Sequence, residues 1–295
     1  MSDVLLIGNG INRAFDSVSW SNLIDRIKHK NNTDLADIDL SKIPLPMQVV
    51  LASDDNVCEA VKLFHEDLDK VNTEDQNQLI NKLLRLPVDE LITTNYSFEI
   101  EQICLEKPSI YNYRKLRKHS KDIKNKDVLF NLYRYYAVDD NKKIWHIHGD
   151  ITQPSTIIIG TYYYGKLVRE IQNYVSDFMR RYKSVVSKGE IYKKLSWVDS
   201  FLTENIHMVG FGFDFNETDL WWLIGCKKRN FPNTKIYYYT PESDISKEKE
   251  MMLMVFGVKV IKDISFEGSY PEFYERVVDR VSTTINRKDE DNEKY

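Results

Sequence analysis

The sequence lacks the features of disulfide-bonded, zinc-binding and membrane-spanning proteins. Its 295 residues include only three cysteines, Cys58, Cys104 and Cys226, which stand far apart and form no CxxC pair. This spacing suggests neither a disulfide framework nor a zinc cage. No apolar run is long enough to cross a membrane, and the N-terminus has neither the basic segment nor the long apolar segment of a signal peptide. We therefore expect a cytoplasmic protein with no membrane partner.

An excess of positive charge is also absent. The chain carries 41 Lys and Arg against 45 Asp and Glu, which gives a formal net charge of −4. Proteins that act mainly on nucleic acid need a clear cationic excess to pair with phosphates, so no direct nucleic-acid binding is expected. A short basic run at residues 114–118 is better interpreted as the solvated face of a helix.

What the chain does contain is a series of short apolar runs that alternate with helical patterns. Such nearly continuous apolar strands, separated by helices, are typical of a parallel sheet that is covered on both faces. The sequence therefore predicts an α/β, Rossmann-like fold with a mainly parallel six-stranded sheet, helices on both faces and a helical insertion layer. The six predicted strands lie within residues 3–10, 88–96, 143–150, 205–213, 234–241 and 257–263.

Neither a linker nor an internal repeat divides the chain. We expect one domain over residues 1–285, with helical insertions at about 47–85 and 166–205. The stretch 108–142 is expected to be irregular, and "STIIIGTYYYG" (155–165) is a candidate for a further short strand. Residues 286–295 have no apolar anchor and are expected to form a disordered tail.

Four of the predicted strands end in unusual polar or glycine-rich sequences. They are "GNGINR" (8–13), "TTNY" (93–96), "HGD" (148–150) and "GFGFDFNETD" (210–219). In open α/β sheets, ligands bind beyond the carboxyl ends of the strands. The four endings therefore predict one binding crevice to which all of them contribute.

The first ending, Gly8-Asn9-Gly10, has two interpretations. Its glycines would let the backbone approach a phosphate at a helix N-terminus, or they would serve only a structural turn. A complete dinucleotide fingerprint would need a glycine where the chain has Arg13, so a hydride-transferring dehydrogenase is disfavoured. Arg13 is instead a candidate to pair with a diphosphate.

Two histidines, His146 in the third strand and His148 in the ending that follows it, have side chains that share one direction along a strand. His148 is a candidate base, because the imidazole pKa lies near working pH, and its alternative is a structural strand-end histidine. His146 is given a structural role. Asn95 could bond a ribose hydroxyl, fix a water or serve a turn. No further ligands stand at a convincing spacing for zinc.

In this order, the four endings resemble motifs of the SIR2 (sirtuin) family, and most closely those of the SIR2-like NAD-consuming effectors of bacterial anti-phage defence. The first motif is similar to "LIGNGINRAF" with a downstream "SWSNL" (19–23). The later motifs are similar to "ITTNY", "HIHGD" and "VGFGFDFNETDLWWLI". The resemblance spans about residues 4–285.

The resemblance implies an NAD+ hydrolase that cleaves NAD+ into nicotinamide and ADP-ribose, with NAD+ as substrate and no metal. It implies that Asn95 and His148 are catalytic and flank the nicotinamide ribose. By motif position, the implied NAD+-binding residues are Gly8, Asn9, Gly10, Asn12, Arg13, Thr94, Tyr96, Gly149, Asp150, Gly210, Phe211, Gly212, Phe213 and Asp214.

The departures from the family pattern define the alternatives. The family Asp after Asn-Tyr is Ser97 here, which leaves open a catalytically weak module that binds NAD+ or ADP-ribose and signals to a partner. The four-cysteine zinc module of protein deacylases is absent, so deacylation is less favoured. For the hydrolase, the resemblance implies an abortive-infection effector that is gated by a co-encoded sensor or regulatory protein, or by assembly into a homo-oligomer.

Overall fold

The computed structural model describes residues 2–15, 24–28, 38–53, 71–120, 131–138 and 142–292. The motif at residues 19–23 and part of the first predicted insertion, residues 54–70, lie outside them. One mixed eight-stranded sheet forms the centre, in the order β3-β4-β5-β2-β1-β6-β7-β8. The strands are β1 (Asp3–Ile7), β2 (Glu90–Thr93), β3 (Arg117–His119), β4 (Arg134–Val138), β5 (Lys142–His146), β6 (Asn205–Val209), β7 (Ile236–Tyr239) and β8 (Val258–Ile261).

Six strands, from β5 to β8 in the sheet order, pair only in parallel with one another. The chain builds outward from β1 to β2 and β5, and then returns to the other side of β1 for β6, β7 and β8. This is the doubly wound order, in which the direction of building reverses between β1 and β6. At the carboxyl ends, Ile7 lies between Thr93 and Val209, and Thr93 is next to His146.

The prediction of six strands was wrong, because two antiparallel strands extend the sheet beyond β5. Strand β4 pairs with β5 through Tyr136 and Ile144, and the three-residue β3 pairs with β4 at the sheet edge. Both added strands lie in the stretch expected to be irregular. The β4 sequence RYYAV alternates buried and partly exposed residues. Because one of the buried residues is an arginine and both tyrosines are polar, the sequence contains no apolar run that would indicate a strand.

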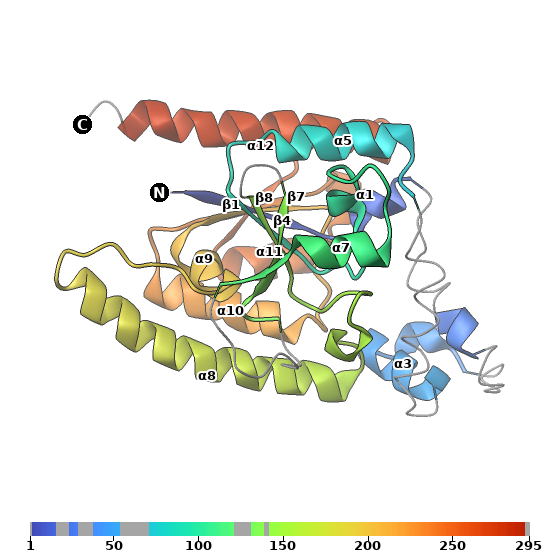
Figure 1. The fold of residues 1–295 in the computed structure, drawn as a ribbon. Helices are drawn as coiled ribbons and strands as arrows, with labels where there is room; N and C mark the ends of the chain where they lie inside the picture. Colours follow the sequence, from blue (N-terminus) through green and yellow to red (C-terminus); the bar gives the residue numbers. More distant parts are fainter. Residues whose placement is uncertain are drawn as a thin grey trace.

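Helices cover both faces of the sheet, as predicted. Along β1, Val4 and Leu6 join a core cluster with residues of α8 (Thr161–Val186), α9 (Trp197–Thr203), α10 (Thr218–Asn230) and α11 (Lys247–Val255). Leu5 and Ile7 join a second cluster with residues of α5 (Glu74–Leu84) and α12 (Tyr270–Asn292). This division follows from the alternation of side chains along a strand. Figure 1 shows α5 and α12 side by side along one side of the sheet and α8 along the other.

The helices have the following bounds. They are α1 (Gly10–Arg13), α3 (Leu45–Ser53), α5 (Glu74–Leu84), α6 (Glu99–Gln102), α7 (Ile110–Leu116), α8 (Thr161–Val186), α9 (Trp197–Thr203), α10 (Thr218–Asn230), α11 (Lys247–Val255) and α12 (Tyr270–Asn292), with the short 3-10 helices η1 (Leu40–Lys42), η2 (Pro154–Thr156) and η3 (Glu242–Asp244). Residues 24–28 are also helical. Among the described helices, none combines the length and the apolar character that crossing a membrane requires.

Three predicted segments differ from the structure. The sequence "STIIIGTYYYG" forms no strand, because η2 occupies its start and α8 begins at Thr161, directly after Gly160. The second predicted insertion, at about 166–205, is helical as expected, but it is divided between α8, which already begins at Thr161, and the separate helix α9. Helix α12 continues to Asn292, into the segment expected to be a tail.

Candidate active site

A pocket of about 520 Å³ opens at the carboxyl ends of the parallel strands. Loops after β1, β2, β6 and β7 contribute to its lining, together with the start of α12. Eight of the residues predicted to bind NAD+ line it: Asn9, Gly10, Arg13, Thr94, Gly210, Phe211, Gly212 and Asp214. The pocket is also lined by residues that no sequence motif had indicated as binding residues, namely Ala14, Leu45, Glu217, Tyr238, Tyr239, Thr240, Pro241, Asp244, Tyr270 and Tyr274.

The glycine turn after β1 packs directly on the loop after β6. The Gly8 N–H donates to Val209 O at 3.0 Å, and the Gly10 N–H donates to Gly210 O at 2.7 Å. A Cβ on Gly8 would lie 2.5 Å from Gly210 O, so the two loops can approach this closely only with glycine there. The interpretation of this turn as a phosphate site at a helix N-terminus needs correction on one point. Helix α1 is only four residues long, so its N-terminus offers little helix dipole to a phosphate.

The loop after β6 has an unusual backbone. Phe213 is the only non-glycine residue with a positive φ, 53°, in the part of the chain that the structure describes. Its ring is buried against Phe211 and Trp221, with centroids 5.2 and 4.7 Å away, so it does not line the pocket itself. The Trp221 indole N–H donates to Asp214 O at 2.9 Å. These contacts fix the loop that carries Asp214 and Glu217.

His148 is held by carboxylates from the same loop and from α10. Its Nε2 lies 2.9 Å from Asp219 Oδ2 and 3.7 Å from Glu217 Oε2, and the ring is only 2% exposed. Burial acts to lower the pKa of His148, but the negative charges of Asp219 and Glu217 outweigh it and leave that pKa raised. The His148 ring also contacts the Tyr164 ring edge-on, at 5.3 Å.

Glu217 joins this group to the pocket. It lines the pocket with 19% of its side chain exposed, and its Oε2 accepts a hydrogen bond from the Tyr164 hydroxyl at 3.4 Å. Burial raises the pKa of Glu217, His148 opposes this, and Asp219 adds to it, so that the pKa reaches about 7. The residue stands inside the quoted motif "GFGFDFNETD", but no spacing rule singled it out.

Asn95, the residue after Thr94, forms a buried pair with His146, and neither of the two lines the pocket. The Asn95 N–H donates to Thr93 Oγ1 at 3.1 Å, and the Asn95 carbonyl accepts from His146 Nδ1 at 2.7 Å. His146 Nε2 lies 2.8 Å from Glu101 Oε1. His146 therefore supports the backbone next to Asn95, as its predicted structural role requires. Asn95 Oδ1 is buried without a hydrogen-bond partner among the described residues.

A family model described as a SIR2-like domain matches residues 89–261. The chain belongs to the SIR2-like family. The matched residues run from the start of β2 to the end of β8, and they include Asn95, His148 and the loop after β6. No curated protein is similar enough to the chain to count as a match.

Two predicted binding residues of this SIR2-like domain, Gly149 and Asp150, do not line the pocket. The Asp150 carboxylate accepts from Arg134 Nη2 at 2.5 Å and from the Thr152 N–H at 3.0 Å, and it is fully buried. Gly149 has φ +90°, and a Cβ there would collide with Thr156 O. Both residues thus shape the turn after β5, and the carboxylate of Asp150 is committed to the arginine of β4.

Four other residues of the SIR2-like motifs lie behind the lining. Asn12 is buried and donates from Nδ2 to Asn9 Oδ1 at 3.2 Å. The Tyr96 hydroxyl donates to Ile158 O at 2.8 Å. Gly8 serves the loop contact described above. Ser97, where the family has Asp, is buried, and its hydroxyl donates to Glu99 Oε1.

The His148–Asp219–Glu217 group also bears on the expectation that the SIR2-like domain needs no metal. One potential ligand atom from each side chain lies within 4.8 Å of the others, and this is the one such group of three in the described parts of the chain. However, His148 Nε2 and Asp219 Oδ2 are at hydrogen-bonding distance. In this structure the three side chains form a hydrogen-bonded ion-pair network, and the expectation of no metal stays a prediction.

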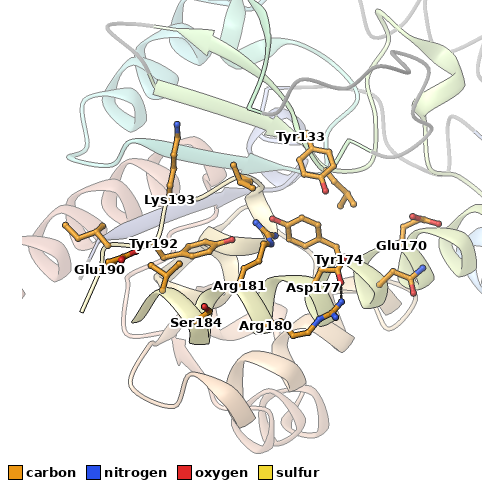
Figure 2. A pocket seen from close by; sticks show the side chains of 15 residues that line it. Tyr133, Glu170, Tyr174, Asp177, Arg180, Arg181, Ser184, Glu190, Tyr192 and Lys193 are labelled. Atoms are coloured by element: carbon orange, nitrogen blue, oxygen red, sulfur yellow. Dashed lines mark hydrogen bonds and ion pairs between the residues drawn. The ribbon is translucent and has the colours of Figure 1, made fainter. Parts of the chain in front are cut away.

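A second and larger pocket, of about 1040 Å³, lies along α8 (Figure 2). Figure 2 shows Arg181 near Tyr174 and Tyr192, and its guanidinium lies 5.6 and 5.9 Å from their ring centroids. Both tyrosine hydroxyls donate to the buried carboxylate of Asp199, at 2.7 and 3.4 Å. The described residues that line this pocket include no histidine and none of the strand-end residues, so the candidate active site is the smaller pocket.

Proposed function

We propose that this SIR2-like chain is an NAD+ hydrolase that releases nicotinamide and leaves ADP-ribose. One observation carries the proposal: through Glu217, the network of His148, Asp219 and Glu217 reaches the pocket that the loops after β1, β2 and β6 line. In doubly wound sheets, dinucleotides bind at the point where the strand order reverses, and here that point lies between β1 and β6.

The lining of the pocket suits a dinucleotide. Its volume of about 520 Å³ is in the usual range for small-molecule and cofactor sites. Arg13 is the only cation among the described lining residues, and it is the candidate to pair with the pyrophosphate. Tyr238, Tyr270 and Tyr274 offer aromatic surface for the rest of the ligand.

The acidic side of the pocket suits the cleavage step. When neutral nicotinamide leaves, positive charge develops on the ribose, and fixed carboxylates aimed at it lower the barrier. Asp214 and Glu217 line the pocket and supply such charge. Asn95 does not itself line the pocket, but it follows Thr94, which does, and its side-chain oxygen is buried and unpartnered among the described residues. We propose that this oxygen holds a water or a ribose hydroxyl. His148 polarises that group through the network it forms with Glu217 and Asp219.

A module that only binds NAD+ or ADP-ribose is the alternative that Ser97 suggested. Ser97 does not line the pocket, and its hydroxyl is engaged by Glu99, so the departure lies outside the contact surface. The departure at Ser97 therefore does not weigh against the hydrolase. The resemblance to anti-phage effectors further supports a role in abortive infection, in which a partner protein or assembly of the chain controls the hydrolase.

Product analysis tests the proposal. The purified chain, alone and with co-encoded proteins, is incubated with NAD+, and nicotinamide and ADP-ribose are quantified by proton NMR. We expect equal amounts of both products, no stimulation by an acetyl-lysine peptide, and no effect of a metal chelator. NAD+ that binds but stays intact under all these conditions would support the binding module instead, and peptide-dependent release would support a deacylase.

A further inference from the structure

Glu217 is the only member of the His148–Asp219–Glu217 group that reaches the pocket surface. His148 is 2% exposed and Asp219 is fully buried, and neither lines the pocket. The Glu217 side chain keeps 19% of its surface accessible. A substrate in the pocket therefore meets the Glu217 carboxylate, with the histidine behind it.

Residues from several elements surround Glu217. Tyr164 of α8 donates to Glu217 Oε2 at 3.4 Å, and His148, after β5, lies 3.7 Å away. The charges of Asp214 and Asp219 act on it from its own loop and from α10, and Tyr96, after β2, also feels its charge. The histidine favours the carboxylate, whereas burial and the two aspartates favour the protonated acid.

This balance gives Glu217 the property that proton transfer requires. Its pKa of about 7 lies far above the ordinary value of a glutamate, chiefly because of burial. A base works best when its pKa is close to the operating pH, since it is then both available and able to hold a proton. The raised pKa supports a role that the geometry indicates first.

We propose that Glu217 is the general base of NAD+ cleavage and that His148, oriented by Asp219, acts through Glu217 as a positioning residue. The inference rests on the proposed hydrolase function. In the step, the oxygen of a water forms a bond to the ribose C1′ while the C1′–nitrogen bond breaks, and its electron pair stays on nicotinamide. The water's proton passes to the Glu217 carboxylate and then to solvent, so the products are nicotinamide, ADP-ribose and a proton.

Glu217→Gln tests the base directly, because it keeps the shape of the side chain and removes its ability to take a proton. We expect kcat for nicotinamide release to fall on the order of 10²–10⁴-fold, while NAD+ binding measured by calorimetry stays within a few-fold of wild type. Glu217→Asp keeps a carboxylate and should retain part of the activity. The matched control is Glu190→Gln, an exposed carboxylate of the α8 pocket, which should behave as wild type.

The pH profile separates a base from a structural residue. Nicotinamide release by the wild type should rise with pH through about 7 as Glu217 ionises. In His148→Ala, the cation that favours the carboxylate is lost, so the rise should move to higher pH and part of the activity should return there.

The possible outcomes are distinct. If a folded Glu217→Gln releases nicotinamide at the wild-type rate, Glu217 is not the general base, but the proposed hydrolase function is unaffected. Should Glu217→Gln fail to fold, Glu217→Asp decides in its place: a wild-type rate and an unchanged pH profile would overturn the inference. Absence of release by the wild type under every condition would overturn the proposed hydrolase and this inference with it.

Discussion

His148 Nε2 and Asp219 Oδ2 form a 2.9 Å hydrogen bond between residues that stand 71 positions apart in the chain. The bond joins the end of β5 to the first turn of α10, across the ends of β2 and β1. It fixes the orientation of the imidazole ring at the crevice. Because Asp219 is fully buried, this contact is shielded from water and depends little on salt.

Removal of the Asp219 carboxylate should reduce the rate of cleavage without weakening NAD+ binding. Asp219→Asn keeps the size of the side chain but removes the charge that raises the pKa of His148. We expect kcat for nicotinamide release to fall by roughly 10-fold to 100-fold, the size of the loss when the partner that orients a metal-ligating histidine is removed, with little change in KM. Steady-state kinetics measure both constants. A rise in KM at unchanged kcat would mean that Asp219 serves binding instead.

Asp150 should matter for stability rather than for NAD+. Asp150→Ala leaves Arg134 buried without its carboxylate, and breaking a buried pair in this way typically costs about 3–5 kcal/mol. Urea unfolding should show this loss in the free energy of unfolding. If the variant unfolds like the wild type but binds NAD+ more weakly, Asp150 is a ligand contact after all.

A methyl group at Gly10 should separate the two loops that form the crevice. In Gly10→Ala the new Cβ would lie 2.6 Å from both Gly210 O and the Tyr274 hydroxyl oxygen, closer than real contacts allow. We expect weaker NAD+ binding by calorimetry, together with a lower unfolding temperature. The matched control is Gly165→Ala in α8, where the Cβ meets nothing within 4 Å. That helix-interior change should stabilise the protein by up to about 1 kcal/mol.

His146 should support the fold most strongly at low pH. Burial lowers the pKa of His146, but Glu101 and the hydrogen bonds of the ring outweigh burial and leave the pKa raised in the folded protein. A raised pKa means that the charged ring stabilises the fold fully below its unfolded value of about 6.5, and that this contribution is lost as pH rises through the folded pKa.

Urea unfolding of the wild type and His146→Gln at several pH values measures this contribution. The difference in the free energy of unfolding should be larger at about pH 6 than at about pH 9. The opposite trend, with the larger difference at high pH, would show that His146 is held in its neutral form.

The sequence alone predicted the strands that consist of continuous apolar runs. Six parallel strands and helices on both faces follow from runs such as that of β1, where Val4 to Ile7 are all buried. Strand β4 was missed because its alternation is carried by tyrosines and Arg134, and Arg134 is buried only because Asp150 pairs with it. That ion pair is a tertiary contact, which a local sequence pattern cannot predict.

The candidate site was predictable to the same extent. The rule that ligands bind beyond the carboxyl ends of parallel strands indicated the loops that line the pocket, including Asn9, Thr94 and Gly210. It could not separate lining residues from those beneath the lining, because Tyr96 and Asp150 are turned to other partners by contacts distant in sequence. Glu217 could be recognised as a candidate functional residue only from the structure, in which it lies between His148 and the pocket.

The most direct measurement of the central claim is nicotinamide release at saturating NAD+ by the wild type, His148→Ala and Asn95→Ala, each shown by circular dichroism to be folded. We expect release by the wild type and, near pH 7, a loss on the order of 10²–10⁴-fold in each variant. If both folded variants released nicotinamide at the wild-type rate, the cleavage would not depend on this site, and the proposed function of the pocket would be wrong.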